Sequence, residues 1–130
     1  MDDNRIKYGA LLKNVYEKAL KPAGFRRYGA NFRSFTKSAI FTTGRLVSFV
    51  KREDNGKLTF TVLLGKKSSF NGEPTASFKV NECAIPERTY LTELSGDGSK
   101  RFTVDGDTEP LETELCRLIK EYALPWFGLI

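Results

Sequence analysis

Residues 45–65, RLVSFVKREDNGKLTFTVLLG, contain the clearest indication of the fold. Apolar and polar residues alternate in both halves of this stretch, which is typical of β-strands with one buried face. We therefore predict strands over Arg45–Arg52 and Lys57–Gly65. Asn55-Gly56 tolerates the positive φ angles of a tight turn, so the two strands are expected to form an antiparallel hairpin. The second strand places four apolar residues on one face: Leu58, Phe60, Val62 and Leu64.

The same alternation extends the sheet on both sides of the hairpin. A strand is predicted over Asn31–Lys37, with Phe32 and Phe35 on opposite faces. A polar loop is expected over Ser68–Pro74. The other expected elements are a strand over Thr75–Ile85 that ends at Pro86, a strand or short helix over Arg88–Leu94, and a last short strand over Arg101–Val104.

Two amphipathic helices are predicted at the ends of the chain. The first has apolar residues at helical spacing and ends near Pro22 and Gly24. The second opens at Thr108-Glu109-Pro110, with Asp107 or Thr108 as its N-cap, and is expected to end at Pro125. The two apolar stripes are Tyr8, Leu11, Leu12, Val15, Tyr16, Ala19 and Leu20, and then Leu111, Leu115, Leu118, Ile119 and Tyr122.

These elements predict a single α+β domain over residues 1–130. Its antiparallel sheet of about four to six strands is flanked by the N-terminal and C-terminal helices, both on one face. The opposite face must then be polar, covered by a loop, or used for binding. The apolar tail Trp126–Ile130 either packs on the core or supports a partner contact such as a dimer.

Composition excludes several kinds of site. The 130 residues include no histidine and only two cysteines, Cys83 and Cys116. Ser-His-Asp triads, Cys-His dyads and histidine metal sites are therefore absent, and the cysteine spacing matches no zinc or redox motif. Both cysteines are expected to be buried free thiols, although their spacing leaves a disulfide open. We predict no cofactor and no bound transition metal.

Acidic residues provide the remaining acid–base chemistry. Asp97, Asp105, Asp107 and Glu109 cluster around a turn and a helix start, a set that either binds a cation or suits the positive end of a helix. We favour the second interpretation. An enzyme with a carboxylate-based site is kept as an alternative.

Positive charge is concentrated in the first half of the chain. Residues 1–67 contain 15 Lys/Arg and 5 Asp/Glu, whereas residues 68–130 contain 6 and 11, giving an overall net charge of +5. The two halves either neutralise each other or leave a basic surface for an anionic partner. The candidate partner-binding residues are Arg26, Arg27, Arg33, Lys51, Arg52, Lys66, Lys67 and Arg88.

Several segments, in order along the chain, resemble a bacterial family of unknown function, domain of unknown function 4304. Leu20-Lys21-Pro22-Ala23-Gly24-Phe25 is similar to its helix-to-strand junction, and Phe60–Gly65 is similar to one of its strands. Glu82-Cys83-Ala84-Ile85 with Arg88 is similar to its "E-C-H-I-R-x-R" segment, and Pro125-Trp126 to its last helix. Ala84 and Pro86 replace a histidine and an arginine of that segment, and Arg88 is kept. The resemblance implies the fold and a cytoplasmic bacterial origin, and it implies no established activity.

The resulting hypothesis is a non-enzymatic protein-interaction module, an adaptor or immunity-like domain, with an unknown protein as partner. Nucleic-acid binding by a basic and aromatic sheet edge is the alternative partner class. No stretch approaches the roughly 18 apolar residues of a membrane span. The acidic, polar start at Met1–Arg5 does not resemble a secretory leader, so we expect a cytoplasmic protein with no membrane partner.

Overall fold

The computed structural model describes residues 3–38, 41–70, 78–98 and 100–129. Its strands form one antiparallel sheet in the order β1-β2-β3-β4-β5, and β6 pairs with β4 on the same side as β5. The strands are β1 (Arg26–Tyr28), β2 (Asn31–Ser38), β3 (Phe41–Asp54), β4 (Lys57–Phe70), β5 (Arg88–Tyr90) and β6 (Phe102–Val104).

The predicted hairpin forms the centre of this sheet. Strands β3 and β4 pair along their whole length, from Phe41↔Phe70 to Asp54↔Lys57. Asn55 and Gly56 have φ angles of 52° and 76°, the conformation that a two-residue turn with a matching right-handed twist requires. Both strands are longer than predicted, and Ser68–Phe70 belongs to β4 rather than to the polar loop. These residues pair with Phe41–Thr43, so the strand continues through Ser68 and Ser69 although their side chains are polar.

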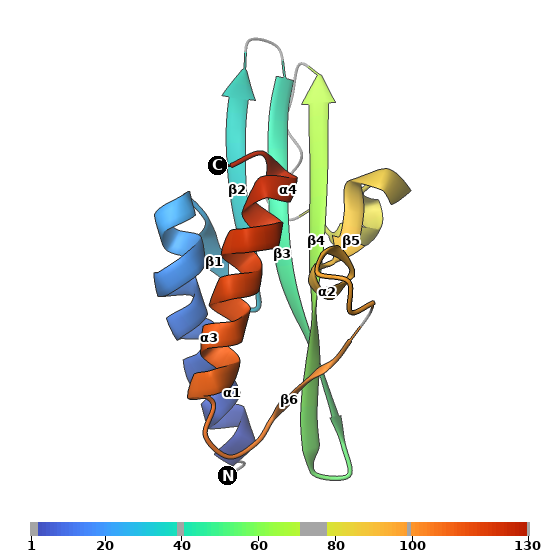
Figure 1. The fold of residues 1–130 in the computed structure, drawn as a ribbon. Coiled ribbons are helices and arrows are strands. Elements are labelled where there is room, and N and C mark those ends of the chain that lie inside the picture. Colours follow the sequence, from blue (N-terminus) through green and yellow to red (C-terminus); the bar gives the residue numbers. More distant parts are fainter. Residues whose placement is uncertain (1–2, 39–40, 71–77, 99, 130) are drawn as a thin grey trace.

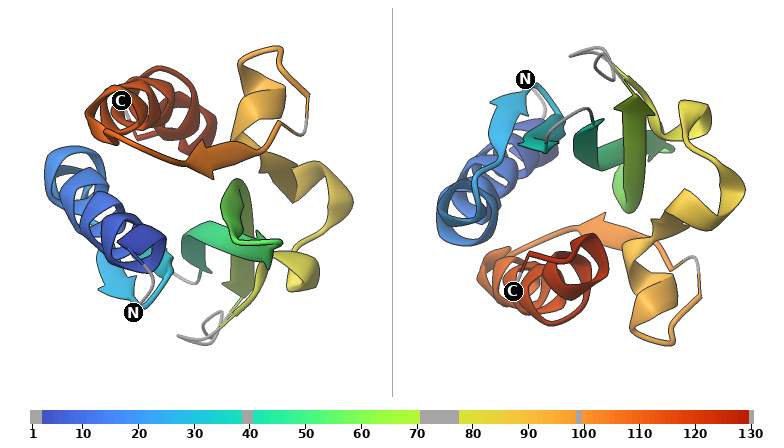
Figure 2. Two further views of the ribbon diagram at one scale, coloured as in Figure 1. Left: turned by 90° about the horizontal axis from the view of Figure 1, so that it is seen from below. Right: turned by 90° about the horizontal axis from the view of Figure 1, so that it is seen from above.

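Two helical segments cover one face of the sheet and lie side by side (Figures 1 and 2). The first consists of α1 (Asp3–Val15), a π turn over Tyr16–Leu20 and a 3-10 turn over Lys21–Ala23. The second consists of α3 (Glu109–Leu118), a π turn over Ile119–Ala123 and α4 (Leu124–Phe127), and a separate short helix, α2 (Leu91–Leu94), follows β5. No helix of the described residues is long and apolar enough to cross a bilayer.

The prediction that Pro125 ends the last helix is wrong. The helix continues to Phe127 and ends at Gly128, whose φ angle is 76°. The π turn before Pro125 explains why the helix tolerates this proline. In that turn the Leu124 N–H donates to the carbonyl of Ile119, five residues back. This wider turn relieves the clash between a proline ring and the preceding turn of an α-helix.

The main core lies between the helices and the alternating positions of the sheet. Leu58, Phe60, Val62 and Leu64 are all buried there, as the alternation predicted. The tail packs on the same core, because Phe127 is buried and its ring lies 5.6 Å from that of Phe25. The α+β fold predicted from the sequence is therefore confirmed.

The opposite face of the sheet carries a second, smaller core of Leu46, Phe78, Cys83 and Val80. The prediction of a strand over Thr75–Ile85 is wrong for its described part, residues 78–85. Val80–Glu82 forms a 3-10 turn, and a second 3-10 turn covers Ile85–Glu87. This segment lies across the sheet and packs individual apolar side chains against it. Its apolar residues therefore do not follow the alternation of a strand. Residues 71–77 lie outside the described part of the chain.

Candidate functional site

A pocket opens beside the edge strand β5, on the face of the sheet opposite the helices. We call it the β5 pocket; its volume is about 440 Å³. Arg88 and Tyr90 on β5 pair with Gly65 and Leu63 on β4, so all four belong to the same face. The lining residues are Leu63, Val80, Asn81, Ile85, Arg88, Thr89, Tyr90 and Glu93.

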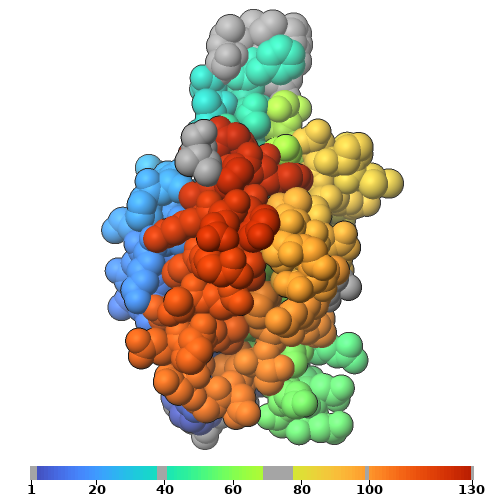
Figure 3. Space-filling view, in the orientation of Figure 1, coloured from blue at the N-terminus to red at the C-terminus, as the bar shows by residue number. Residues whose placement is uncertain are grey.

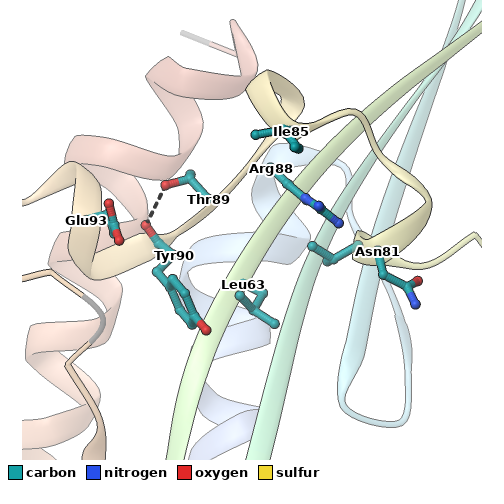
Figure 4. A pocket seen from close by; sticks show the side chains of 8 residues that line it. Leu63, Asn81, Ile85, Arg88, Thr89, Tyr90 and Glu93 are labelled. Carbon is teal, nitrogen blue, oxygen red and sulfur yellow. Dashed lines mark hydrogen bonds between the residues drawn. The ribbon is translucent and has the colours of Figure 1, made fainter.

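Gly65 determines how residues 80–85, which form one wall of the β5 pocket, pack on the sheet. A Cβ atom at this position would lie 2.9 Å from the Cys83 Sγ and 3.5 Å from a methyl group of Val80. The missing side chain therefore lets Cys83 pack directly on β4. This contact holds residues 80–85 beside β5, and the hollow lies between the two segments (Figure 4).

The floor and rim of the β5 pocket are apolar. Leu63 and Val80 are half-buried at its base. Ile85 is 76% exposed, the largest exposed fraction among the exposed large apolar side chains of the described residues. A solvent-exposed isoleucine beside a pocket provides apolar surface that a bound partner would cover.

Arg88 supplies the positive charge of the β5 pocket. Figure 4 shows its side chain pointing toward Asn81. Within the described residues, the Arg88 guanidinium has no hydrogen bond and no ion pair, whereas Arg45 and Arg117 both have partners. Glu93 lies on the other side of Tyr90, so the two charges occupy opposite ends of the pocket (Figure 4). An anionic group of a ligand would therefore be oriented toward Arg88.

Cys83 borders this region but is not a reactive thiol. It is 5% exposed, and its Sγ donates to the Lys79 carbonyl at 3.7 Å. Burial raises the pKa of the Cys83 thiol, and the nearby positive charges of Lys67 and Arg88 oppose this rise only in part. Because the thiolate is the nucleophilic form, this environment favours an inert structural cysteine. Cys116 is also a free thiol.

Among the described residues, the one buried carboxylate lies in the helical layer, away from the β5 pocket. Glu112 accepts a hydrogen bond from the Asn14 amide at 2.9 Å and forms an ion pair with Lys18. The Lys18 hydrogen bond holds the pKa of Glu112 below its usual value, which keeps the carboxylate ionised. This arrangement joins two helices and lacks the raised pKa of a general acid.

The acidic cluster lies in two places. At the start of α3, Thr108 is the N-cap residue, and its side chain makes no capping hydrogen bond. The Asp107 carboxylate, one residue earlier, accepts a hydrogen bond from the Glu109 N–H at 3.1 Å, so Thr108 holds the predicted N-cap position while Asp107 supplies the side-chain acceptor. Asp97 accepts from the Ser95 hydroxyl in a separate turn. The described residues contain no group of three or more potential metal ligands.

The structure distributes the eight predicted partner-binding residues over both faces of the sheet. Arg26 and Arg33 face each other across β1 and β2 on the side opposite the helices. Arg33 is buried, lies 5.4 Å from the Tyr28 ring centroid and donates to the Phe78 carbonyl at 3.2 Å, so it holds the second core in place. Arg27 lies on the helix side, 6.0 Å from the Phe32 ring centroid.

The remaining predicted residues occupy three places. The Lys51 Nζ lies 5.9 Å from the Tyr8 ring centroid on the helix side. The Lys66 Nζ donates to the Trp126 carbonyl at 3.0 Å and lies over that ring, which anchors the apolar tail. The Lys67 Nζ donates to the Glu82 carbonyl at 3.5 Å, next to Cys83, and Arg52 lies at the far end of the hairpin beside Asp54. Arg88 is the one member of the predicted set that lines the β5 pocket.

Sequence reasoning missed the apolar part of the β5 pocket. Leu63 and Tyr90 come together because β4 and β5 pair, and Ile85 joins them through the contact between Cys83 and Gly65. The available signal was Ile85 beside Pro86, an apolar residue in a segment that cannot continue a strand.

A protein-family model matches residues 16–129, and its description is a domain of unknown function (DUF4304). The chain belongs to this family. No match was found among the curated proteins or the solved structures. The β5 pocket lies wholly inside the DUF4304 match, as does the junction at Leu20–Phe25. At that junction the Gly24 φ angle of 92° ends the helix and lets Phe25 turn into the core.

Proposed function

We propose that this DUF4304 domain is a non-enzymatic protein-interaction module that docks its partner in the β5 pocket. The partner segment carries a carboxylate beside an apolar side chain. The observation that supports this proposal is that one pocket brings together a 76% exposed Ile85 and an Arg88 guanidinium that has no partner among the described residues. Interfaces commonly place arginine and large apolar side chains together at their energetic centre.

The charges of the pocket fix the expected orientation of the partner segment. Its carboxylate meets Arg88, while its apolar side chain covers Leu63, Val80 and Ile85. A carboxylate directed at Glu93 would be repelled, which selects one orientation. We also propose a bacterial cytoplasmic location, because two free thiols suit a reducing compartment.

A displayed library of random peptides tests this proposal with a defined probe. We expect selected peptides to combine acidic and apolar residues. Their affinity should fall at least about tenfold in Arg88→Gln, the loss of about 1.4 kcal/mol that a charge-assisted hydrogen bond supplies. Ile85→Ser should also weaken binding. Lys120→Gln, an exposed charge change in the helical layer, is the matched control and should bind like the original protein.

Two results would overturn the proposal. One is a library that yields no binding peptide enriched in acidic residues. The other is a set of peptides whose affinity is the same for Arg88→Gln and for the Lys120→Gln control. Circular dichroism of each variant confirms that the fold is retained before affinities are compared.

A further inference from the structure

A second pocket, of about 430 Å³, lies at the far end of the central hairpin; we call it the hairpin groove. Cross-strand pairs Arg52↔Thr59 and Asp54↔Lys57 place these residues on the sheet face opposite the helices. Arg101 joins them from the residue before β6. The lining residues are Arg52, Asp54, Asn55, Lys57, Thr59 and Arg101.

Positive charge dominates the hairpin groove. Three cations line it against one carboxylate, Asp54. The ion pair between Arg52 and Asp54 is long, at 3.9 Å, and both side chains are about two-thirds exposed, with 67% and 65% exposed fractions. Such a pair contributes little to stability and leaves the Arg52 guanidinium available to a stronger anion.

One cation of the groove is held in place by the sheet. The Arg101 Nε donates to the Thr59 hydroxyl at 3.0 Å, which orients the guanidinium and leaves its terminal nitrogens for a ligand. The Lys57 backbone pairs with Asp54, whereas its ammonium lines the groove and has no hydrogen bond and no ion pair within the described residues. Figure 3 shows the tip of the hairpin projecting at the lower end of the molecule.

We propose that the hairpin groove binds the phosphodiester backbone of a nucleic acid without reading its bases. Separate cations along an open groove fit a chain of evenly spaced phosphates. None of the described residues that line the groove is aromatic, so they offer no stacking surface for a base. A docked protein segment would need an apolar anchor, which the β5 pocket has and this groove lacks.

The test is a titration of the full chain with fluorescent single-stranded and duplex oligonucleotides of two unrelated sequences. We expect binding at about 20 mM salt with similar affinity for both sequences. Three phosphate contacts predict that single-strand affinity falls about twentyfold between about 50 and 200 mM salt. The triple variant R52Q/K57Q/R101Q should lose most of the affinity and most of the salt dependence.

The control is a triple variant with the same charge change in the helical layer, K13Q/K21Q/K120Q, which should bind within about twofold of the original protein. Absence of binding at low salt overturns the proposal. So does an equal loss in both triple variants, because the attraction would then arise from net charge alone. The β5 pocket is unchanged in all these variants, so its peptide binding is tested independently.

Discussion

At the scale of single residues, two glycines show how one missing side chain determines packing. Gly44 on β3 lies under the Phe78 ring, and a Cβ atom there would lie 2.8 Å from the Phe78 Cε1 and 3.1 Å from the Phe35 Cε1. Gly9 in α1 is exposed, and a Cβ atom there would contact nothing within 4 Å. The first glycine is therefore required by its surroundings, and the second is only an unfavourable helix residue.

Alanine substitutions at these two positions should have opposite effects. Gly44→Ala forces the buried Phe78 ring to move and should destabilise the protein by about 1–3 kcal/mol. Gly9→Ala should stabilise it by up to about 1 kcal/mol, because alanine favours the helix. Urea unfolding measures both changes. Equal effects of the two substitutions would contradict the packing described for Phe78.

At the scale of elements, one buried carboxylate joins the two helical segments. Glu112 on α3 is 9% exposed and engages Asn14 of α1 and Lys18 of the following π turn. The apolar stripes of both helices already explain their contact with the sheet. Glu112 adds a polar contact at one position, which fixes how the two helices align along each other.

The pH dependence of stability should report this contact. Since the folded state lowers the pKa of Glu112, its contribution is present above the ordinary glutamate pKa of about 4.3 and is lost as the pH falls through the lowered value. Glu112→Gln keeps an acceptor for Asn14 but loses the charge. It should cost about 1 kcal/mol at neutral pH and little at low pH.

Urea unfolding of both proteins between neutral and acidic pH provides the measurement. Glu114→Gln, at a half-buried carboxylate that pairs with Arg117 on the same helix, is the matched control. A difference between the original protein and Glu112→Gln that stayed constant with pH would contradict a lowered pKa of Glu112 in the folded state and thereby the stabilising ion pair with Lys18.

At the scale of the whole molecule, the sheet separates two cores of unequal size. The main core joins helices and sheet, and the second consists of Leu46, Phe78, Cys83 and the flanking Val80. The second core holds residues 78–85 on the sheet and thereby forms one wall of the β5 pocket. The binding site that we propose therefore depends on the smaller core.

Removal of Phe78 should expose Cys83. Phe78→Ala leaves a cavity where a fully buried ring packed and should cost about 3–5 kcal/mol. In a Cys116→Ser background, labelling of Cys83 by a thiol reagent should be slow in the folded protein and at least about tenfold faster after Phe78→Ala. Phe35→Ala, whose ring is 39% exposed and packs edge-on against Phe78, should give a smaller increase. Unchanged labelling after Phe78→Ala would show that other contacts hold the segment.

The elements whose contacts are local could be predicted from the amino-acid sequence. Asn55-Gly56 between two alternating stretches specified the central hairpin, and helical spacing specified both helices with most of their buried residues. Arg88 was identified as a candidate binding residue, and Asp107 and Thr108 as the candidates for the N-cap of α3.

The remaining features could be read only from the folded chain, because they depend on residues that are distant in the sequence. Because Gly65 has no side chain, Cys83 packs directly on β4, and residues 78–85 cover the sheet without forming a strand. The pairing of β4 with β5 builds the pocket around Arg88, and the folding of β6 against β4 brings Arg101 to the hairpin groove. Local periodicity carries no information on such contacts, since it records only which face of its own element a residue occupies.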